Sequence, residues 1–377
     1  MSRCPAITID TEFLRERTYW PKLCLVQLAS SPDDARAVDA LAEGIDLAPL
    51  FELMQNRAVI KVFHAARQDL EIFYHLTGEV PVPVFDTQVA AMVAGYGESV
   101  GYETLVNSIA KAGVDKAAQY TDWSRRPLSQ RQISYAIADV THLWPIYRKL
   151  SDRLAASGRS SWLDEEMAIL ADPKTYAPDP EQAWRRLKMR NRNGGYLAVL
   201  KGVAAWRERR AEGRNVPRNR VLRDEVVQQI ASEQPRGLDG LRQIRGLSRD
   251  LKGGAEATSL LAAIDEALAA PKETLPKPKP PRRLPAEAGP MVDLLKVLLK
   301  MVSERESVAS KLIATVSDLE AIAAEGEAAE VAALAGWRRH IFGDEALALR
   351  AGRLALAVTD GKLRAIPLGE AAARRQA

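Results

Sequence analysis

Apolar residues at the start of the chain fall into short runs with the alternation of β-strands. Three such runs cover residues 6–12, 22–29 and 35–39, and polar turns separate them. The period then changes, because "LAPLFELM" has the spacing of a helix and "AVIKVF" that of a fourth strand. An amphipathic helix follows over "AARQDLEIFYHL", and Gly78 stands where a glycine ends a helix. Strands followed by alternating helices and strands predict a mixed α/β sheet.

Helical patterns dominate the chain after Asp86. This residue ends a short apolar stretch, where its carboxylate is compatible with capping the helix that begins "TQVAAMV" or with supporting an acidic site. Farther along, Ser129 and Gln132 form a capping box that marks the start of a helix. We expect this helix to continue through Asp139 and to kink or end at Pro145.

Changes in composition divide the chain into successive segments. The first part has the α/β pattern, the looser stretch "DPKTYAPDP" follows it, and only helical patterns come after that. Seven prolines in the 20 residues from 271 to 290 predict an extended, semi-rigid linker. We therefore expect an α/β domain over residues 1–170, joined by a short linker (171–180) to a helical domain over residues 181–270. A proline-rich linker (271–290) then leads to a second all-helical domain over residues 291–370, and residues 371–377 form a tail.

Composition places the chain among soluble globular proteins. It has 377 residues, too many for one ordinary core, and 47% of them are hydrophobic and 27% charged. Its two cysteines, Cys4 and Cys24, are too few for a disulfide framework or a four-ligand zinc site, and they suit a reducing compartment. The most apolar segment, "MVDLLKVLLKMV", is too short to span a membrane, and the first residues lack the apolar stretch of a signal peptide. We therefore expect a cytoplasmic protein.

The net charge of +4 hides an uneven distribution. Residues 1–150 contain 15 Lys and Arg against 18 Asp and Glu, whereas residues 181–253 contain 18 against 8. A strongly basic helical segment favours a polyanionic partner, and nucleic acid is the most common one. A solvated, arginine-rich helical face would have the same composition.

Two acidic residues interrupt the first apolar run. Side chains alternate along a strand, so Asp10 and Glu12 share one face while Ile7 and Ile9 share the other. Two carboxylates on one face repel each other unless a cation or a proton compensates them. An exposed strand end with two solvated carboxylates is the simpler alternative.

Further carboxylates favour a metal site. Asp69 lies in the first turns of the helix after the fourth strand, and Tyr135 and Asp139 share a helix face. With Asp10 and Glu12, the two aspartates make a set of four carboxylates, and oxygen ligands select Mg²⁺ or Mn²⁺ rather than zinc. Two such ions about 3.5–4 Å apart support in-line attack on a phosphodiester, and Tyr135 would hold or deprotonate the attacking water.

Four segments of the chain resemble the motifs of a known family. The segments "IDTEFLRERTYWPKLCLVQLA", "FHAARQDLEIFYHLTG", "VFDTQVAA" and "TDWSRRPLSQRQISYAIADV" are similar, in order and spacing, to those of ribonuclease D, a family of DEDD exonucleases with a ribonuclease-H-like fold. The helical part from "EQAWRRLKMRNRNGGYLAVL" to "GLRQIRGLS" resembles the HRDC domain that follows the nuclease. Residues 291–370 stand where the family has a second, more divergent HRDC-like domain. The family usually has a strand and a helix before its first motif, whereas nine residues precede Asp10 here.

The resemblance implies four metal ligands and one water-positioning tyrosine. The ligands of the three motifs match Asp10, Glu12, Asp69 and Asp139, and the tyrosine matches Tyr135. Ser134 stands where the histidine branch of the family has its histidine, so the resemblance is to the tyrosine branch.

The same resemblance implies a 3′→5′ exoribonuclease that uses two divalent metal ions, Mg²⁺ or Mn²⁺, and releases 5′-mononucleotides. RNA is the implied partner, above all tRNA precursors trimmed at the 3′ end. No membrane and no organic cofactor are expected, and the chain is expected to be a monomer. A DNA 3′→5′ exonuclease is an alternative, because the metal site does not distinguish ribose from deoxyribose. A non-catalytic RNA-binding scaffold is the alternative outside the enzymes.

Basic and aromatic residues beside these motifs are candidates for RNA contact, since rings stack on bases and cations bind phosphates. The loop after the first strand offers Phe13, Arg15, Arg17, Tyr19, Trp20 and Lys22. The entry to the Tyr135 helix offers Trp123, Arg125 and Arg126. The basic segment offers Arg185, Arg186, Lys188, Arg190 and Arg192, and a second cluster at Arg207, Arg209, Arg210 and Arg214. A partly buried hairpin turn, a polar helix entry and solvated arginines are the structural alternatives.

Overall fold

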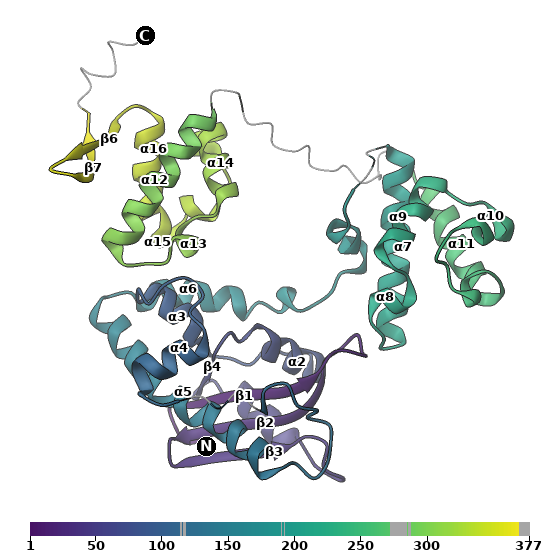
Figure 1. Cartoon of the computed structure of the whole chain (residues 1–377), viewed down its shortest axis with the longest axis horizontal. Coiled ribbons are helices and arrows are strands. Elements are labelled where there is room, and N and C mark those ends of the chain that lie inside the picture. The colour runs from purple at the N-terminus through teal and green to yellow at the C-terminus, as the bar shows by residue number, and fades with distance from the viewer. Residues whose placement is uncertain are drawn as a thin grey trace.

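The chain forms an α/β domain followed by two helical domains (Figure 1). The computed structural model describes residues 1–113, 115, 118–189, 191, 193–271, 285 and 288–368. The α/β domain contains β1 (Ala6–Leu14), β2 (Lys22–Ser31), β3 (Asp34–Asp39), α1 (Ala48–Gln55), β4 (Ile60–Phe63), α2 (Arg67–Thr77), β5 (Val84–Asp86), α3 (Thr87–Val93), α4 (Tyr102–Leu105), α5 (Gln130–Ala156) and α6 (Ser160–Leu170). These elements confirm the predicted mixed sheet with helices.

β1 is the central strand of a five-stranded sheet with the order β3-β2-β1-β4-β5. It pairs antiparallel with β2 and parallel with β4. Ile7 and Ile9 are buried on one face of the strand. On the other face, the Thr8 hydroxyl donates a hydrogen bond of 2.8 Å to the backbone carbonyl of Val140 in α5. Because side chains alternate, α5 covers the face of β1 that also carries positions 10 and 12.

Local sequence signals set the ends of two helices near these positions. Gly78 ends α2 in the left-handed conformation, with φ 76°. At the start of α5, the Gln132 backbone N–H donates to Ser129 Oγ at 3.2 Å, and the Ser129 backbone N–H donates to Gln132 Oε1 at 3.0 Å. Both predicted helix ends are therefore confirmed.

Of the two outcomes predicted at Pro145, a kink or an end, the end is excluded, because α5 continues through this residue to Ala156. A proline inside a helix removes one backbone hydrogen bond and costs about 3 kcal/mol. Three buried residues around it, Leu143, Ile146 and Leu150, hold the helix in the core. Each such side chain contributes roughly 1.5–3 kcal/mol when fully buried, so packing outweighs the loss.

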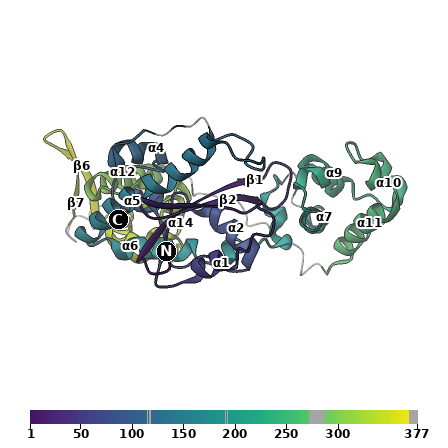
Figure 2. The same cartoon turned by 90° about the horizontal axis from the view of Figure 1, so that it is seen from below.

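The first helical domain has a buried core of its own, formed by side chains such as Val203, Ile230 and Leu260. Its described elements are a 3-10 turn (Pro180–Arg186), α7 (Gly194–Gly213), α8 (Arg218–Val221), α9 (Asp224–Glu233), α10 (Gly237–Gln243) and α11 (Gly254–Ala269). Figures 1 and 2 both place this domain to one side of the α/β domain, with the loop between β1 and β2 pointing towards it.

The second helical domain shares its core with the α/β domain. Its elements are α12 (Ala288–Glu306), α13 (Ser310–Ile313), α14 (Val316–Glu325), α15 (Gly336–Arg338), α16 (Asp344–Arg350), β6 (Leu354–Thr359) and β7 (Lys362–Pro367). Leu295 and Phe342 belong to the same buried cluster as Leu143 of α5. Within the described parts of the chain, no helix has both the length and the apolar character needed to cross a membrane.

The strands β6 and β7 correct the prediction of an all-helical domain over residues 291–370. They pair antiparallel as a hairpin, and Asp360 and Gly361 at its turn have φ values of 53° and 71°. A two-residue Asp-Gly loop with both φ values positive suits the twist of the flanking strands. The signal was therefore present in "LAVTDGKLRAI", where apolar and polar residues alternate around the turn.

Candidate active site

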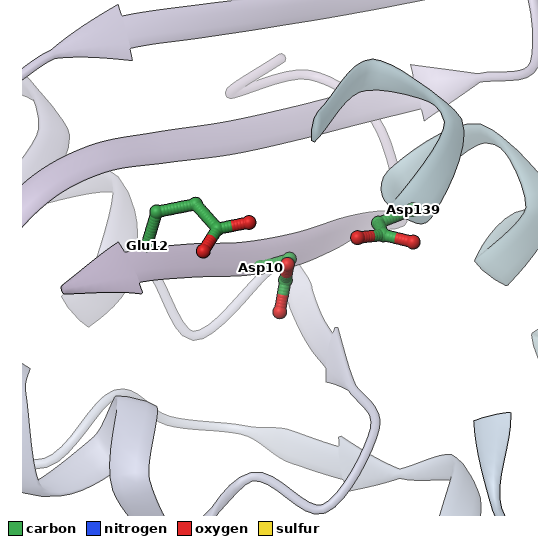
Figure 3. Close-up of side chains that lie close together, drawn as sticks. All are labelled: Asp10, Glu12 and Asp139. Carbon is green, nitrogen blue, oxygen red and sulfur yellow. The ribbon is translucent and has the colours of Figure 1, made fainter. Parts of the chain in front are cut away.

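Three carboxylates meet where β1 passes under α5 (Figure 3). Alternation along β1 points Asp10 and Glu12 to the same side, and α5 supplies Asp139 from above. Each of the three has an oxygen atom within 4.8 Å of an oxygen of the other two. The pairing between β1 and β2 shifts by one residue immediately after Glu12, and such a bulge increases the local twist of the strand. The structure thus brings three of the four predicted carboxylates into one group.

Asp69 approaches this group from the neighbouring helix. It lies in the first turn of α2 and is 7% exposed. The Thr11 hydroxyl donates a hydrogen bond to Asp69 Oδ1, and Thr11 stands between Asp10 and Glu12 in the chain. Burial raises the pKa of Asp69 well above its usual range, and the nearby Asp10 carboxylate raises it further. Asp69 is therefore electrostatically part of the acidic group although it lies outside the set of three.

Asp86 fixes the backbone from which α2 begins. Its carboxylate accepts hydrogen bonds from the N–H groups of Ala65 at 3.0 Å and Ala66 at 2.9 Å. Ala65 has a left-handed backbone with φ 57°, so this turn needs such support. The same carboxylate caps α3 by accepting from the Gln88 N–H at 2.8 Å. The predicted capping role is confirmed, and Asp86 also positions the helix that carries Asp69.

Tyr135 lies one turn before Asp139 on α5, and its hydroxyl partly offsets the effect of burial on the pKa of the Asp139 carboxyl. The Trp123 ring, which is buried, lies 6.1 Å from the Tyr135 ring. The Tyr102 hydroxyl donates a hydrogen bond to the backbone carbonyl of Asp139. These contacts hold the helix turn that faces β1.

Burial and mutual repulsion raise the pKa of the carboxyl groups at this site. For Asp10 the pKa rises because burial removes water from the charged form. For Glu12, burial is the largest cause of the raised pKa, and repulsion by the other carboxylates adds to it. The pKa of Asp139 is raised by burial and then by Asp10. A cation would relieve both effects, because it replaces lost hydration and offsets the repulsion.

The donor set suits a hard divalent cation. Every candidate donor is a carboxylate oxygen, which Mg²⁺ and Mn²⁺ prefer, whereas zinc sites use nitrogen and sulfur as well. Asp10 and Glu12 are only partly buried, so the group remains open to a substrate from solvent. The residues present therefore fit a divalent metal site.

The loop between β1 and β2 makes contacts inside the protein. Tyr19 is 6% exposed and belongs to the core of the first helical domain, which the sequence did not indicate. Trp20 is half-buried and stacks on His75 of α2, with ring centres 4.2 Å apart, in agreement with the partly buried turn. Arg15 pairs with Glu71 of α2 through two hydrogen bonds of 2.7 and 2.8 Å. Phe13 packs against the α/β core, while Arg17 and Lys22 are exposed.

The entry to α5 is held mainly by structural contacts. The Arg126 guanidinium bonds to Asp39 and donates to the carbonyl of Cys24 at 2.9 Å. Arg125 is exposed and lies 3.5 Å from Asp122. Arg126 thus joins the α5 entry to β2 and β3, and a phosphate would have to displace Asp39 to reach it.

The basic clusters are divided between exposed side chains and side chains paired inside the protein. Arg185, Arg186 and Lys188 are exposed, whereas Arg190 and Arg192 lie outside the described residues. Arg207 is 3% exposed and donates to Asp224 and to a backbone carbonyl, so its prediction as a surface cation was wrong. Composition counts an arginine on the inner face of α7 in the same way as one on its outer face. It therefore could not distinguish buried arginines from exposed ones.

Two residues of the site had no signal in the sequence. Thr11 lies on the face of β1 opposite to Asp10, and its bond to Asp69 joins residues 58 positions apart. Tyr102 reaches Asp139 from α4 across 37 positions. Both contacts depend on how the elements pack, which periodicity does not reveal.

Comparison with known proteins gives the same picture over nearly the whole chain. Residues 1–155 match the family described as 3′-5′ exonuclease, and residues 196–263 match the HRDC domain. The chain is 52% identical over 363 residues to the ribonuclease D of Nitrobacter hamburgensis, which covers 96% of this chain and 94% of that protein. It is 50% identical over 367 residues to the ribonuclease D of Gluconacetobacter diazotrophicus, with 97% and 93% covered. The solved structure of Escherichia coli RNase D, described as an exoribonuclease involved in structured RNA processing, matches with a TM-score of 0.77 at 31% identity, covering 93% of this chain and 94% of that one.

Proposed function

The chain belongs to the ribonuclease D family of 3′→5′ exoribonucleases, and we propose that the acidic group between β1 and α5 performs the reaction. The observation that carries this proposal is the meeting of three carboxylates within 4.8 Å, in the domain that matches the exonuclease family. The proposed catalytic residues are Asp10, Glu12, Asp69, Tyr135 and Asp139.

The exonucleases of this family need divalent metal ions, and we propose that Asp10, Glu12 and Asp139, supported by Asp69, hold two of them, Mg²⁺ or Mn²⁺. Bound there, the ions would lower the pKa of the attacking water and stabilise the leaving oxygen. Tyr135 is placed to orient that water, because it lies one turn before Asp139 on the same face of α5. Burial and the adjacent carboxylates raise the pKa of Tyr135, so the hydroxyl keeps its proton and acts as a hydrogen-bond donor rather than a base.

Water attack on the terminal phosphodiester would release a 5′-mononucleotide and leave a new 3′ hydroxyl on the shortened RNA. We propose structured small RNAs as substrates, above all tRNA precursors with 3′ extensions. The basic first helical domain supports this assignment, since exposed cations such as Arg185, Arg186 and Lys188 bind phosphates without reading sequence. In this proposal residues 1–170 are the nuclease domain, residues 181–270 the HRDC domain that holds the RNA body, and residues 291–370 a second HRDC-like domain.

A cleavage assay tests this proposal. The protein is incubated with a 5′-labelled precursor tRNA that has a 3′ extension, in Mg²⁺, in Mn²⁺ or with a chelator, and a DNA strand of the same sequence is run in parallel. We expect a ladder that shortens from the 3′ end of the RNA and requires metal. Shortening of the DNA at the same rate would favour the DNA exonuclease. Intact RNA in every metal lane, with binding still detected by gel shift, would show that the chain is a binding scaffold.

A further inference from the structure

The loop between β1 and β2, residues 15–21, inserts one side chain into the first helical domain. Tyr19 is 6% exposed, and its hydroxyl donates a 2.5 Å hydrogen bond to Glu208, which is 1% exposed. Arg218 pairs with the same carboxylate at 2.5 Å, and its guanidinium lies 4.7 Å from the centre of the Tyr19 ring. A residue of the nuclease domain thus completes the core of its neighbour and contacts an ion pair between buried Glu208 and half-buried Arg218.

The backbone of the loop is held by one asparagine of the helical domain. Asn215 Oδ1 accepts hydrogen bonds from the backbone N–H groups of Tyr19 at 3.1 Å and Trp20 at 3.0 Å. Asn215 has φ 48°, a left-handed conformation that asparagine tolerates better than most residues. Its side chain therefore presents a fixed acceptor to two consecutive N–H groups.

The same loop is tied to the helix that carries Asp69. Trp20 stacks on His75 of α2, and Arg15 forms two hydrogen bonds with Glu71 of α2. The loop begins directly after β1, the strand that carries Asp10 and Glu12. The loop is fixed to the active-site elements on one side and to the helical domain on the other.

We propose that this loop is a latch that fixes the position of the HRDC domain relative to the active site, with Tyr19 and Asn215 as positioning residues for RNA. Two cavities lie at the junction, and both domains line each of them: Arg15 and Tyr19 from one side, Arg186 and Arg218 from the other. Two of the predicted RNA contacts, Arg15 and Arg186, line these cavities from opposite domains, and each keeps exposed surface beside its ion pair with Glu71 or Glu208. This proposal rests on the proposed function, in which the HRDC domain holds the RNA body.

A closed latch lets one RNA contact both domains at once. When RNA binds one of two linked surfaces, the other surface is held near it at a high effective concentration, which increases the overall affinity. This effective concentration falls when the linkage becomes loose or poorly oriented. An RNA long enough to reach the HRDC domain gains from the latch, whereas a short oligonucleotide occupies the active site alone. Opening the latch should therefore weaken binding of structured RNA and leave the chemical step unchanged.

The test compares latch variants on two substrates. Tyr19→Ala removes the inserted ring, Tyr19→Phe keeps the ring and removes the bond to Glu208, and Asn215→Gly removes the acceptor while allowing the left-handed backbone. Gln243→Ala, at the exposed end of α10, is the matched control. The kinetic constants kcat and KM are measured on a precursor tRNA with a 3′ extension and on a short single-stranded oligoribonucleotide, and small-angle X-ray scattering gives the radius of gyration.

We expect Tyr19→Ala and Asn215→Gly to raise KM for the precursor tRNA by about tenfold, with kcat and both constants on the oligonucleotide within about twofold of wild type. Tyr19→Phe should retain most of the wild-type affinity, and the radius of gyration should increase for Tyr19→Ala and stay at the wild-type value for Gln243→Ala. Asn215 is exposed, so its variant has no core to disrupt and separates positioning from folding.

An unchanged KM for the precursor tRNA in both Tyr19→Ala and Asn215→Gly would overturn the latch. So would an equal loss on both substrates, since that pattern indicates damage to the nuclease domain. If the wild-type protein degraded neither RNA, the proposed function would be wrong, and the radius of gyration would decide the latch alone: expansion of the variants would support it and no change would refute it.

Discussion

The two helical domains are joined to the nuclease domain by different physical means. The second domain shares a buried core with it: Trp162 stacks on Trp337 at 4.7 Å and 8°, and Arg338 pairs with Glu166, each side chain 11% exposed. The first domain has a separate core, into which the nuclease domain contributes Tyr19. Size alone would not predict this difference, since both are small helical units.

The two helical domains also differ in charge. Residues 291–368 contain ten Lys and Arg against eleven Asp and Glu, whereas residues 181–253 contain 18 against 8. The second helical domain is nearly neutral and shares a core with the nuclease domain, which suits a structural role. The first helical domain is basic and is attached through one loop, which suits the binding of a ligand that must enter and leave. If the first helical domain binds RNA as proposed, stability and RNA binding lie in different domains.

Removing the shared core should have the largest effect on stability. Trp337 is 5% exposed, so Trp337→Ala leaves a cavity against Trp162 and should lower the free energy of unfolding of the nuclease domain by roughly 3–5 kcal/mol. Chemical denaturation, followed by a probe in the nuclease domain, measures this loss. A change of less than about 1 kcal/mol would show that the second domain does not support the nuclease domain.

Metal binding should stabilise the nuclease domain and the second helical domain but not the first helical domain. At saturating Mn²⁺, about 100 times the dissociation constant, a ligand that binds only the folded state adds about 2.7 kcal/mol. Calorimetry should show an upward shift of the transition of the nuclease and second helical domains, and none for the first helical domain. Equal shifts in both transitions would contradict the separation of the two units.

The pH dependence of this stabilisation has a definite sign. Burial raises the pKa of Asp10 to about 6 and that of Asp139 to about 8. Below about pH 4 these carboxyls are protonated in both the folded and unfolded states, so their raised pKa has no effect on stability. Above about pH 4 the unfolded state ionises these carboxyls while the folded state keeps them protonated, so metal-free stability falls with rising pH until about pH 6 for Asp10 and about pH 8 for Asp139, and is level beyond. The gain from metal grows over the same range, because metal binds the ionised carboxylates. Thermal shifts with and without Mn²⁺ at pH 5.5 and 8 would test this.

Exposed cations of the two domains should differ in their effect on RNA affinity. Replacing Arg186 and Lys188 by alanine should weaken binding and reduce the slope of log K against log salt by about 0.7–0.9 for each phosphate that the protein no longer neutralises. Replacing Lys296 and Lys300 on α12, which are also exposed, should leave the slope unchanged. Fluorescence anisotropy at several salt concentrations measures both. Equal effects from the two pairs would mean that RNA spreads over both helical domains.

The sequence predicted local features and missed contacts between distant segments. The strands, the end of α2 at Gly78 and the capping box at Ser129 follow from periodicity and hydrogen-bonding chemistry over a few residues. The bond from Tyr19 to Glu208 joins positions 189 residues apart, so no local pattern contained it. The hairpin at Gly361 is different, because its turn signal was visible and was overlooked among helical patterns.

For the acidic site too, the sequence predicted which residues share a face of one element but not how the elements pack together. Alternation alone put Asp10 and Glu12 on one face, and helix spacing put Tyr135 one turn from Asp139. That these two elements cross at the same place depends on the packing of α5 on β1, which the resemblance to a family implied and the residues alone did not. The separation of Asp69 from the group of three was not predictable from either.

The rate of the chemical step in site variants shows whether the acidic group between β1 and α5 performs the reaction. Under single-turnover conditions with saturating Mn²⁺, we measure release of the terminal nucleotide by wild type, Asp139→Asn and the control Asp33→Asn, an exposed carboxylate in the β2–β3 turn. Loss of a metal ligand removes several kcal/mol of transition-state stabilisation, so Asp139→Asn should be slower by roughly a thousandfold while Asp33→Asn matches wild type. A rate for Asp139→Asn within about threefold of wild type would place the reaction elsewhere in the molecule.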